Sequence, residues 1–158
     1  MYDQILALLD EKKYSELKNL LSEMNEADIA AVLKELPQEK LPLLYRILPK
    51  ELAAEVFVNM DSDAQEFLIR AFSDNELREV LDELYVDDAV DIIEEMPATV
   101  VKRILMHTDP EVRKSINEIL QYPEDSAGSI MTIEYVDLKK YMTVEDAFTR
   151  IRRTGVDK

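Results

Sequence analysis

A repeat of twelve residues constrains this chain more than any other feature of its sequence. Residues 2–109 divide into nine blocks of twelve, and the fourth, seventh, eighth and eleventh places of each block are apolar with few exceptions. In the block at 26–37, EADIAAVLKELP, these places hold Ile29, Val32, Leu33 and Leu36. Only Lys12, Gln65 and Thr108 break the rule among 36 such places, whereas a composition that is 47% apolar would leave about half of them polar. Composition alone therefore does not produce the repeat.

The spacing within each block is that of one face of a helix. Apolar residues at i, i+3, i+4 and i+7 form a single stripe along an α-helix, so each block predicts one short helix followed by a tight turn. Three blocks end in proline, at Pro37, Pro49 and Pro97. Ser62 with Gln65, and Ser73 with Glu76, have the spacing of capping boxes at block starts. The block boundaries thus agree with the helical interpretation.

Helices of this length need neighbours. A helix of about ten residues spans roughly 15 Å and is marginal in water, so each block must bury its stripe on other blocks. Stacking consecutive short helices generates a superhelical array, and we predict an all-α solenoid over residues 2–109. Residues 110–122 predict a closing helix that begins at Asp109 as its N-cap. Its predicted inward face holds Val112, Ile116, Ile119 and Leu120.

Charge and composition exclude several classes of function. The chain has 34 acidic and 19 basic residues, and its net charge of −15 argues against a nucleic-acid backbone or an anionic membrane surface as partner. It has no cysteine and a single histidine, His107, which excludes thiol chemistry and Cys/His zinc sites. No apolar run reaches the roughly 18 residues of a membrane span. We expect a soluble cytoplasmic protein that is not an enzyme and has no catalytic residues.

The chain changes character at residues 121–138, QYPEDSAGSIMTIEYVDL. The part PEDSAG is typical of a turn, and TIEYVDL has the β-rich composition of a short strand. A helix is predicted to follow Thr143, with an apolar face of Val144, Ala147, Phe148 and Ile151. Residues 133–158 are therefore predicted to begin a second domain, as a strand and a helix that nothing further in the chain covers.

The run from Tyr122 to Thr132 resembles the junction in MgtE-type bacterial magnesium transporters, where an acidic helical N domain leads into the first CBS domain. The matching residues are Tyr122, Glu124, Asp125, Ala127, Gly128, Met131 and Thr132. The resemblance implies a helical N domain at 1–122, an interdomain junction at 123–132 and the truncated start of a CBS domain at 133–158. It also implies that the N domain is a right-handed superhelix similar to the middle region of the flagellar switch protein FliG.

The same resemblance implies a function and partners. The N domain of this family is regulatory: magnesium bridges the acidic faces of the N and CBS domains and keeps the pore shut. The implied partners are the chain's own CBS domains and a membrane channel domain, in a full-length homodimer on the cytoplasmic side of the bacterial inner membrane. Magnesium is the implied cofactor, bound weakly because the facing CBS ligands are missing. The alternative is a helical-repeat scaffold that binds a protein partner without sensing metal.

The candidate metal ligands are Asp87, Asp88 and Asp91, with Glu55 as the weakest member of the set. Asp87 and Asp91 stand at i and i+4, so their carboxylates share one face of a helix and repel each other. Magnesium prefers oxygen ligands and keeps several waters, so one or two carboxylates from each side of an interface suffice to bridge it. Acids at a helix start also favour the helix dipole, which explains Asp87 and Asp88 without metal but explains Asp91 less well. The resembled family has a similar acidic segment near this place.

The junction supplies a second group of candidate residues. Glu124 and Asp125 are predicted to cap and orient the interdomain turn, and a direct metal contact is the weaker interpretation. Gly128 is predicted to supply a backbone angle that other residues resist. These residues are therefore assigned to the geometry of the junction.

Overall fold

The computed structural model describes residues 2–123 and 125–154, and every regular element in these ranges is helical. The repeat forms α1 (Tyr2–Asp10), α2 (Tyr14–Ser22), α3 (Glu26–Glu35), a 3₁₀ turn η1 (Gln38–Lys40), α4 (Leu41–Tyr45), α5 (Lys50–Val58), α6 (Ser62–Ala71), α7 (Asp74–Glu83), α8 (Val86–Glu95) and α9 (Ala98–His107). Two more helices follow, α10 (Pro110–Ile119) and α11 (Val144–Thr154). The prediction of one short helix for each block is confirmed.

Side-chain caps begin several of these helices. Asp109 caps α10 as predicted, with its Oδ1 accepting from the backbone N–H of Glu111 at 2.9 Å. Ser73 and Glu76 form the predicted capping box of α7: the Glu76 N–H donates to Ser73 Oγ at 3.3 Å, and the Ser73 N–H donates to Glu76 Oε2 at 2.8 Å. Each cap satisfies a donor at a helix start that has no partner inside the helix.

Gln65 does not form the predicted capping box with Ser62. Asp61 is the N-cap of α6, and its Oδ1 accepts from the Ala64 N–H at 2.9 Å. Gln65 is buried instead, and its Nε2 donates to the carbonyl oxygen of Phe57 at 2.8 Å. A buried amide needs such a partner, and the end of α5 provides one, so a polar residue is accommodated at a core place of the repeat.

The repeat places form one continuous core. Every such place from Leu36 to Met96 is buried. Thr108, which breaks the apolar pattern, is buried as well, and its hydroxyl donates to the carbonyl oxygen of Ile104 at 2.8 Å. Lys12 is the only exposed exception among the repeat places, and it turns the chain after α1 with a φ of 57°.

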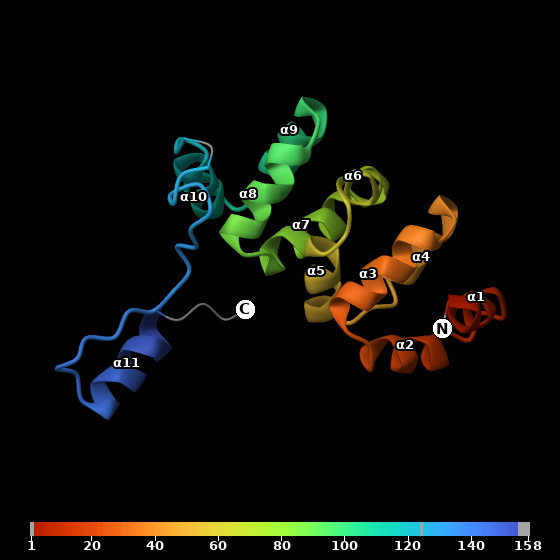
Figure 1. Cartoon of the computed structure of the whole chain (residues 1–158), viewed down its shortest axis with the longest axis horizontal. Helices are drawn as coiled ribbons and strands as arrows, with labels where there is room; N and C mark the ends of the chain where they lie inside the picture. The colour runs from red at the N-terminus through yellow and green to blue at the C-terminus, as the bar shows by residue number, and fades with distance from the viewer. Residues whose placement is uncertain (1, 124, 155–158) are drawn as a thin grey trace.

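Most helices from α3 onward pack on the helix two positions further along the chain. α3 packs on α5, α5 on α7 and α7 on α9, while α4 packs on α6 and α8 on α10. α1 packs on its neighbour α2, and α6 also packs on α9. Figure 1 shows the resulting elongated array, with α1 and α2 at one end and α9 and α10 at the other. Contacts therefore join blocks that lie about two repeats apart. The handedness of the superhelix stays a prediction.

Three aromatic rings that stand at apolar places of the repeat pack together in the middle of the array. The ring centroids of Tyr45 and Phe72 are 5.2 Å apart, and those of Tyr45 and Phe57 are 6.1 Å apart. The Tyr45 hydroxyl donates to the carbonyl oxygen of Ala53 at 2.9 Å. Burial raises the pKa of Tyr45 above its ordinary value, so this hydroxyl is a structural donor in the core.

The closing helix α10 packs on α8, which is therefore buried on two faces. Val86 and Val90 lie outside the apolar places of the repeat, yet both are buried. From α10, Ile116 and Ile119 are buried as predicted. The prediction for Leu120 is wrong: α10 ends at Ile119, and Leu120 is its C-cap and is 37% exposed. Because the helix ends one residue before Leu120, this side chain does not continue the inward face of α10.

The predicted strand after the junction is not formed in the described part of the chain. Residues 131–139 have neither helical nor strand hydrogen bonding, and Figure 1 shows them as an open segment that leads to α11. A strand exists only when a neighbouring strand pairs with it, and these residues have no such neighbour.

α11 begins with the predicted cap, since the Asp146 N–H donates to Thr143 Oγ1 at 3.2 Å. Its apolar face is uncovered, with Val144 74% and Phe148 54% exposed.

Glu76 links two helices of the array, so its removal should weaken the fold. Its carboxylate holds the Ser73 cap and also accepts from Arg46 Nε at 2.5 Å, which ties the end of α4 to the start of α7. We expect Glu76→Ala to lower the free energy of unfolding by about 1–2 kcal/mol. Urea unfolding measures the change, and Glu79→Ala, an exposed residue of α7, is the matched control that should stay within about 0.5 kcal/mol of wild type.

The loss caused by Glu76→Ala should depend on pH. The hydrogen bond from Arg46, together with the Ser73 backbone donor, lowers the pKa of Glu76 to about 2. Stabilisation by the ionised form is therefore present above the ordinary carboxyl pKa of 4.5 and is lost as the pH falls toward 2. The difference between wild type and Glu76→Ala should shrink over that interval. A difference that is independent of pH would contradict the assignment of the effect to the ionised carboxylate.

Candidate functional site

The three candidate aspartates lie together on α8. Asp87 and Asp88 are in its first turn and are half-buried, whereas Asp91 is one turn further and exposed. The N-cap residue Tyr85 makes no side-chain cap to this helix. The structure therefore brings the predicted carboxylates to one end and one face of α8, as their spacing requires.

The environment of Asp91 disfavours its negative charge. Partial burial raises the pKa of Asp91, and repulsion from Asp87 and from Glu95 raises it further. Asp87 and Glu95 stand four residues before and four residues after Asp91, so all three carboxylates follow one stripe of the helix. A cation near this stripe would relieve the repulsion.

One carboxylate oxygen of Asp87 is shielded from solvent. Its Oδ1 is buried and has no hydrogen-bond partner. A buried oxygen without a donor costs free energy, more so when it carries charge. The start of α8 is therefore a place where the fold tolerates an unfavourable arrangement of negative charge.

Glu55 lies in a separate acidic groove that Asp88 also lines. The groove has a volume of about 350 Å³ and runs across α3, α5, α7 and the start of α8. Its carboxylate-bearing residues are Glu26, Glu51, Glu55, Glu83 and Asp88. Glu83 is already paired with Lys50, whose Nζ is 2.8 Å from its carboxylate. Glu26, Glu51 and Glu83 were not singled out from the sequence, because only the packing of helices two blocks apart brings them together.

The described residues do not form a complete metal site by themselves. Within residues 2–123 and 125–154, no three carboxylates or histidines converge so that they could hold a metal ion. Magnesium needs only one or two protein carboxylates when waters complete its shell, so the aspartates of α8 fit one side of a bridged site. The other ligands would have to come from a facing surface.

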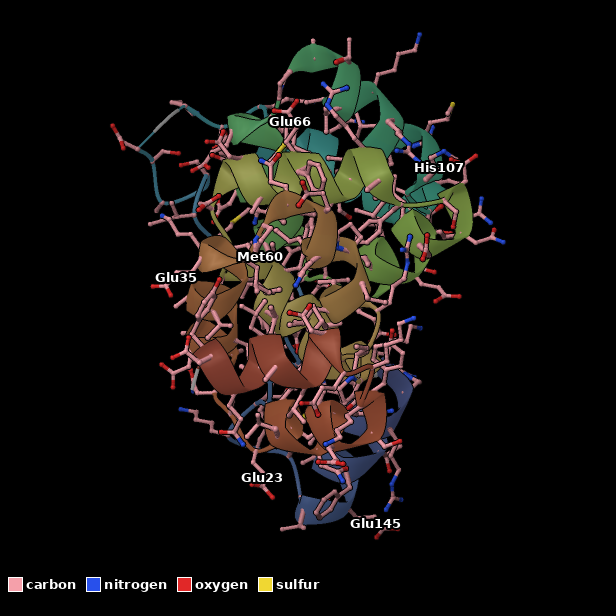
Figure 2. The ribbon with its side chains drawn as sticks, turned by 90° about the vertical axis from the view of Figure 1, so that its right-hand side faces the viewer. Glu23, Glu35, Met60, Glu66, His107 and Glu145 are labelled. Carbon is pink, nitrogen blue, oxygen red and sulfur yellow. The ribbon has the colours of Figure 1, made fainter. Side chains whose placement is uncertain are left out.

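Acidic side chains cover the outside of the array well beyond α8. Figure 2 shows the carboxylates of Glu23 and Glu35 pointing away from the ribbon, and that of Glu145 doing so on α11. His107, also labelled there, ends α9 with its Nε2 at 3.4 Å from Asp74 Oδ1. His107 is thus a helix-end residue with one carboxylate partner, as predicted. The whole surface is acidic. α8 differs from the rest of it in the buried Asp87 Oδ1 and in the close spacing of the Asp87, Asp91 and Glu95 carboxylates.

The junction forms a compact turn around Gly128. The Ser126 N–H donates to the Pro123 carbonyl oxygen, and the Ser129 N–H donates to the Ser126 carbonyl oxygen, both at 3.1 Å. A Cβ atom on Gly128 would lie 2.3 Å from the ring of Tyr122, well inside van der Waals contact. The Tyr122 ring therefore rests directly on the glycine backbone.

The reason predicted for Gly128 is wrong. Its φ is not positive, so it provides space for Tyr122 and not an unusual backbone angle. The positive φ of this turn belongs to Asp125, at 61°, a conformation that aspartate tolerates better than most residues. Glu124, predicted to cap the turn, lies outside the described residues.

Comparisons with known proteins agree with the fold and the junction. A family model described as the MgtE intracellular N domain matches residues 24–125. The chain belongs to this family. The resemblance seen at the junction is thereby confirmed.

Relatives of known type extend the comparison. The magnesium transporter MgtE of Thermus thermophilus is 33% identical over 70 residues, which are 44% of this chain and 16% of that protein. A crystal structure of the cytosolic domain of the Mg²⁺ channel MgtE in complex with ATP superposes with a TM-score of 0.83 at 31% identity, covering 98% of this chain and 63% of that one. The soluble part of a magnesium transporter gives a TM-score of 0.81 at 22% identity, covering 97% and 60%, and shows the fold alone. The chain thus spans less than two thirds of each relative.

Within residues 2–123 and 125–154, no helix is both long enough and apolar enough to cross a membrane.

Asp91→Asn should stabilise the isolated chain at neutral pH. The raised pKa means that ionised Asp91 costs stability above that pKa, and this cost disappears as the pH falls through it. We expect a gain of about 0.2–0.5 kcal/mol near pH 7, the size of a like-charge i, i+4 pair, and no gain near pH 3. Thermal unfolding measures it. Asp28→Asn, an exposed acid in the first turn of α3, is the control and should give no gain.

Gly128→Ala should loosen the junction turn by displacing Tyr122. Hydrogen exchange of the Ser126 and Ser129 amides should accelerate severalfold, because the added Cβ cannot coexist with the ring. In a Tyr122→Ala background the same substitution should add little, since the clash is gone. Equal effects of Gly128→Ala in both backgrounds would show that the ring is not the reason for the glycine.

Proposed function

We propose that this chain is the cytosolic, magnesium-sensing part of a magnesium channel, and that its acidic array docks on CBS domains through bridging magnesium to favour the closed pore. The observation that carries the proposal is the crowded carboxylate stripe of α8, centred on Asp87 and Asp91, in a chain of the MgtE N-domain family. The names of its relatives, a magnesium transporter and the cytosolic domain of a Mg²⁺ channel, support the same assignment.

The mechanism follows from repulsion between like charges. Without a cation, the acidic face of α8 repels any other acidic surface that approaches it. Magnesium between the two surfaces neutralises both, and it needs only one or two carboxylates from each because its waters remain. The array then docks when magnesium is abundant and separates when it is scarce. Asp87, Asp88 and Asp91 supply this chain's side of the bridge, with Glu55 as a weaker contributor from the neighbouring groove.

The proposal also assigns a place and partners to the chain. Its partners are its own CBS domains and a membrane channel domain, which belong to the remainder of a longer protein. The full-length protein is a homodimer whose cytosolic parts lie on the cytoplasmic side of the bacterial inner membrane. Residues 133–158, which include α11, are the start of the first CBS domain, and the rest of that domain covers the apolar side chains that are exposed on α11, such as Phe148.

The test is protease protection of the junction, residues 122–132, in the full-length protein over a range of magnesium concentrations. Docking should shield the junction, so protection should rise with magnesium in the wild type. In Asp87→Asn/Asp91→Asn the midpoint should move to a higher magnesium concentration by severalfold, because one side of the bridge has lost its charge.

A matched control removes the same charge elsewhere. Glu16→Gln/Glu23→Gln neutralises two exposed acids, one in the first turn of α2 and one at its C-cap, at the far end of the array, and should leave the midpoint where it is in the wild type. A similar shift in both double variants would assign the effect to net charge and not to α8. If protease protection of the wild type does not change with magnesium, the docking mechanism is wrong. The alternative function, a scaffold that binds a protein partner, is then favoured.

A further inference from the structure

A hydrogen bond ties the segment after the junction to the start of α8. The backbone N–H of Val86 donates to Glu134 Oε2 at 2.6 Å, across 48 positions of sequence. Val86 is the first residue of α8, and it is buried. The segment that follows the helical array is therefore attached to the same helix that carries the candidate cation ligands.

The contact with Glu134 serves as an N-terminal cap of α8. Asn25, Asp61, Ser73 and Asp109 cap α3, α6, α7 and α10 with their own side chains, whereas the N-cap residues of α5, α8 and α9 provide no side-chain cap. At α8 the N-cap Tyr85 provides no side-chain cap, and the N–H of Val86 has no partner within the helix. A carboxylate is the strongest acceptor for such a donor and also suits the positive end of the helix dipole. Glu134 supplies the missing cap from a distant part of the chain.

The local geometry holds Glu134 in place. Its own N–H donates to Thr132 Oγ1 at 3.3 Å, which fixes the residue as the chain leaves the junction. A cavity of about 310 Å³ beside it is lined by parts of α8 and α10 and by both ends of the following segment, from Ile133 to Thr154. Arg150 pairs with Asp137 and closes that segment on itself. Residues 133–135 and Thr154 thus lie beside the start of α8 and the facing side of α10.

We propose that Glu134 is a positioning residue whose cap on Val86 fixes the direction in which the chain leaves the helical array. Orientation of the described residues beyond the junction, relative to the acidic face of α8, then depends on this contact. Asp87 and Asp88 occupy the same turn and oppose the approach of a third carboxylate, so the cap forms against some charge repulsion. The inference goes beyond the proposed function because it requires no cation.

The test measures the orientation directly. The chain has no cysteine, so cysteines introduced at the exposed positions Lys102 and Thr149 carry two spin labels, one on α9 and one on α11. Distance distributions are recorded in chelator for the wild-type background, Glu134→Ala, Glu134→Gln and the control Glu145→Gln, an exposed acid of α11. We expect a narrow distribution in the wild type and in the control, and a broad one in Glu134→Ala. Glu134→Gln keeps an acceptor oxygen and should lie between them.

Hydrogen exchange of the Val86 amide provides a second readout that a general loss of stability would not single out. Removal of a bond to a charged acceptor should speed this exchange about tenfold or more in Glu134→Ala, while amides in the middle of α8 stay protected. A broad distribution in the wild type, or one that Glu134→Ala leaves unchanged, overturns the inference. No magnesium is present in either measurement, so this failure is distinct from a failure of magnesium-dependent docking.

Discussion

Mutual burial of helices that are too short to persist alone is the constraint on which the whole array depends. Helices of about ten residues are marginal in water, so the apolar stripe of each one must be covered by others. The coverage comes from the helix two positions along, as in the row formed by α3, α5, α7 and α9. Even the two polar residues at core places, Gln65 and Thr108, are buried and hydrogen-bonded to backbone carbonyls. The core is thus continuous, and each helix is held by its neighbours.

The acidic surface is tolerated because the array is open and elongated. Most carboxylates point outward, where water screens their repulsion, and several bases tie distant helices together. Arg46 pairs with Glu76 in this way, and Arg103 of α9 donates to the Phe72 carbonyl oxygen at the end of α6, at 2.7 Å. At α8 this relief is weaker, since the first turn is half-buried and Asp87 Oδ1 has no donor among the described residues. Partial burial therefore separates Asp87 and Asp88 from the carboxylates that point into solvent.

The junction combines local and distant contacts in a few residues. Tyr122 rests on Gly128, and the serine hydrogen bonds complete a turn that sequence composition suggests on its own. Two residues beyond the end of the junction at 132, Glu134 reaches back to the start of α8. The chain leaves the array next to the charged helix, so a domain that follows it begins beside the surface on which it is proposed to dock. The packing of α10 on α8 brings these two places together.

Sequence by itself determined the elements whose cause is local. The twelve-residue spacing specified the helices and their buried faces, the Ser73 and Asp109 signals specified two helix starts, and the junction residues pointed to the family. Tertiary structure alone decided which blocks touch, and so which acids share a groove, because contacts between helices two blocks apart leave no mark in a repeat where every block looks alike. It also decided that Leu120 faces outward, that residues 131–139 pair with no strand, and that Gly128 makes room for a ring. Each of these depends on what surrounds the residue, and a linear pattern records only what precedes and follows it.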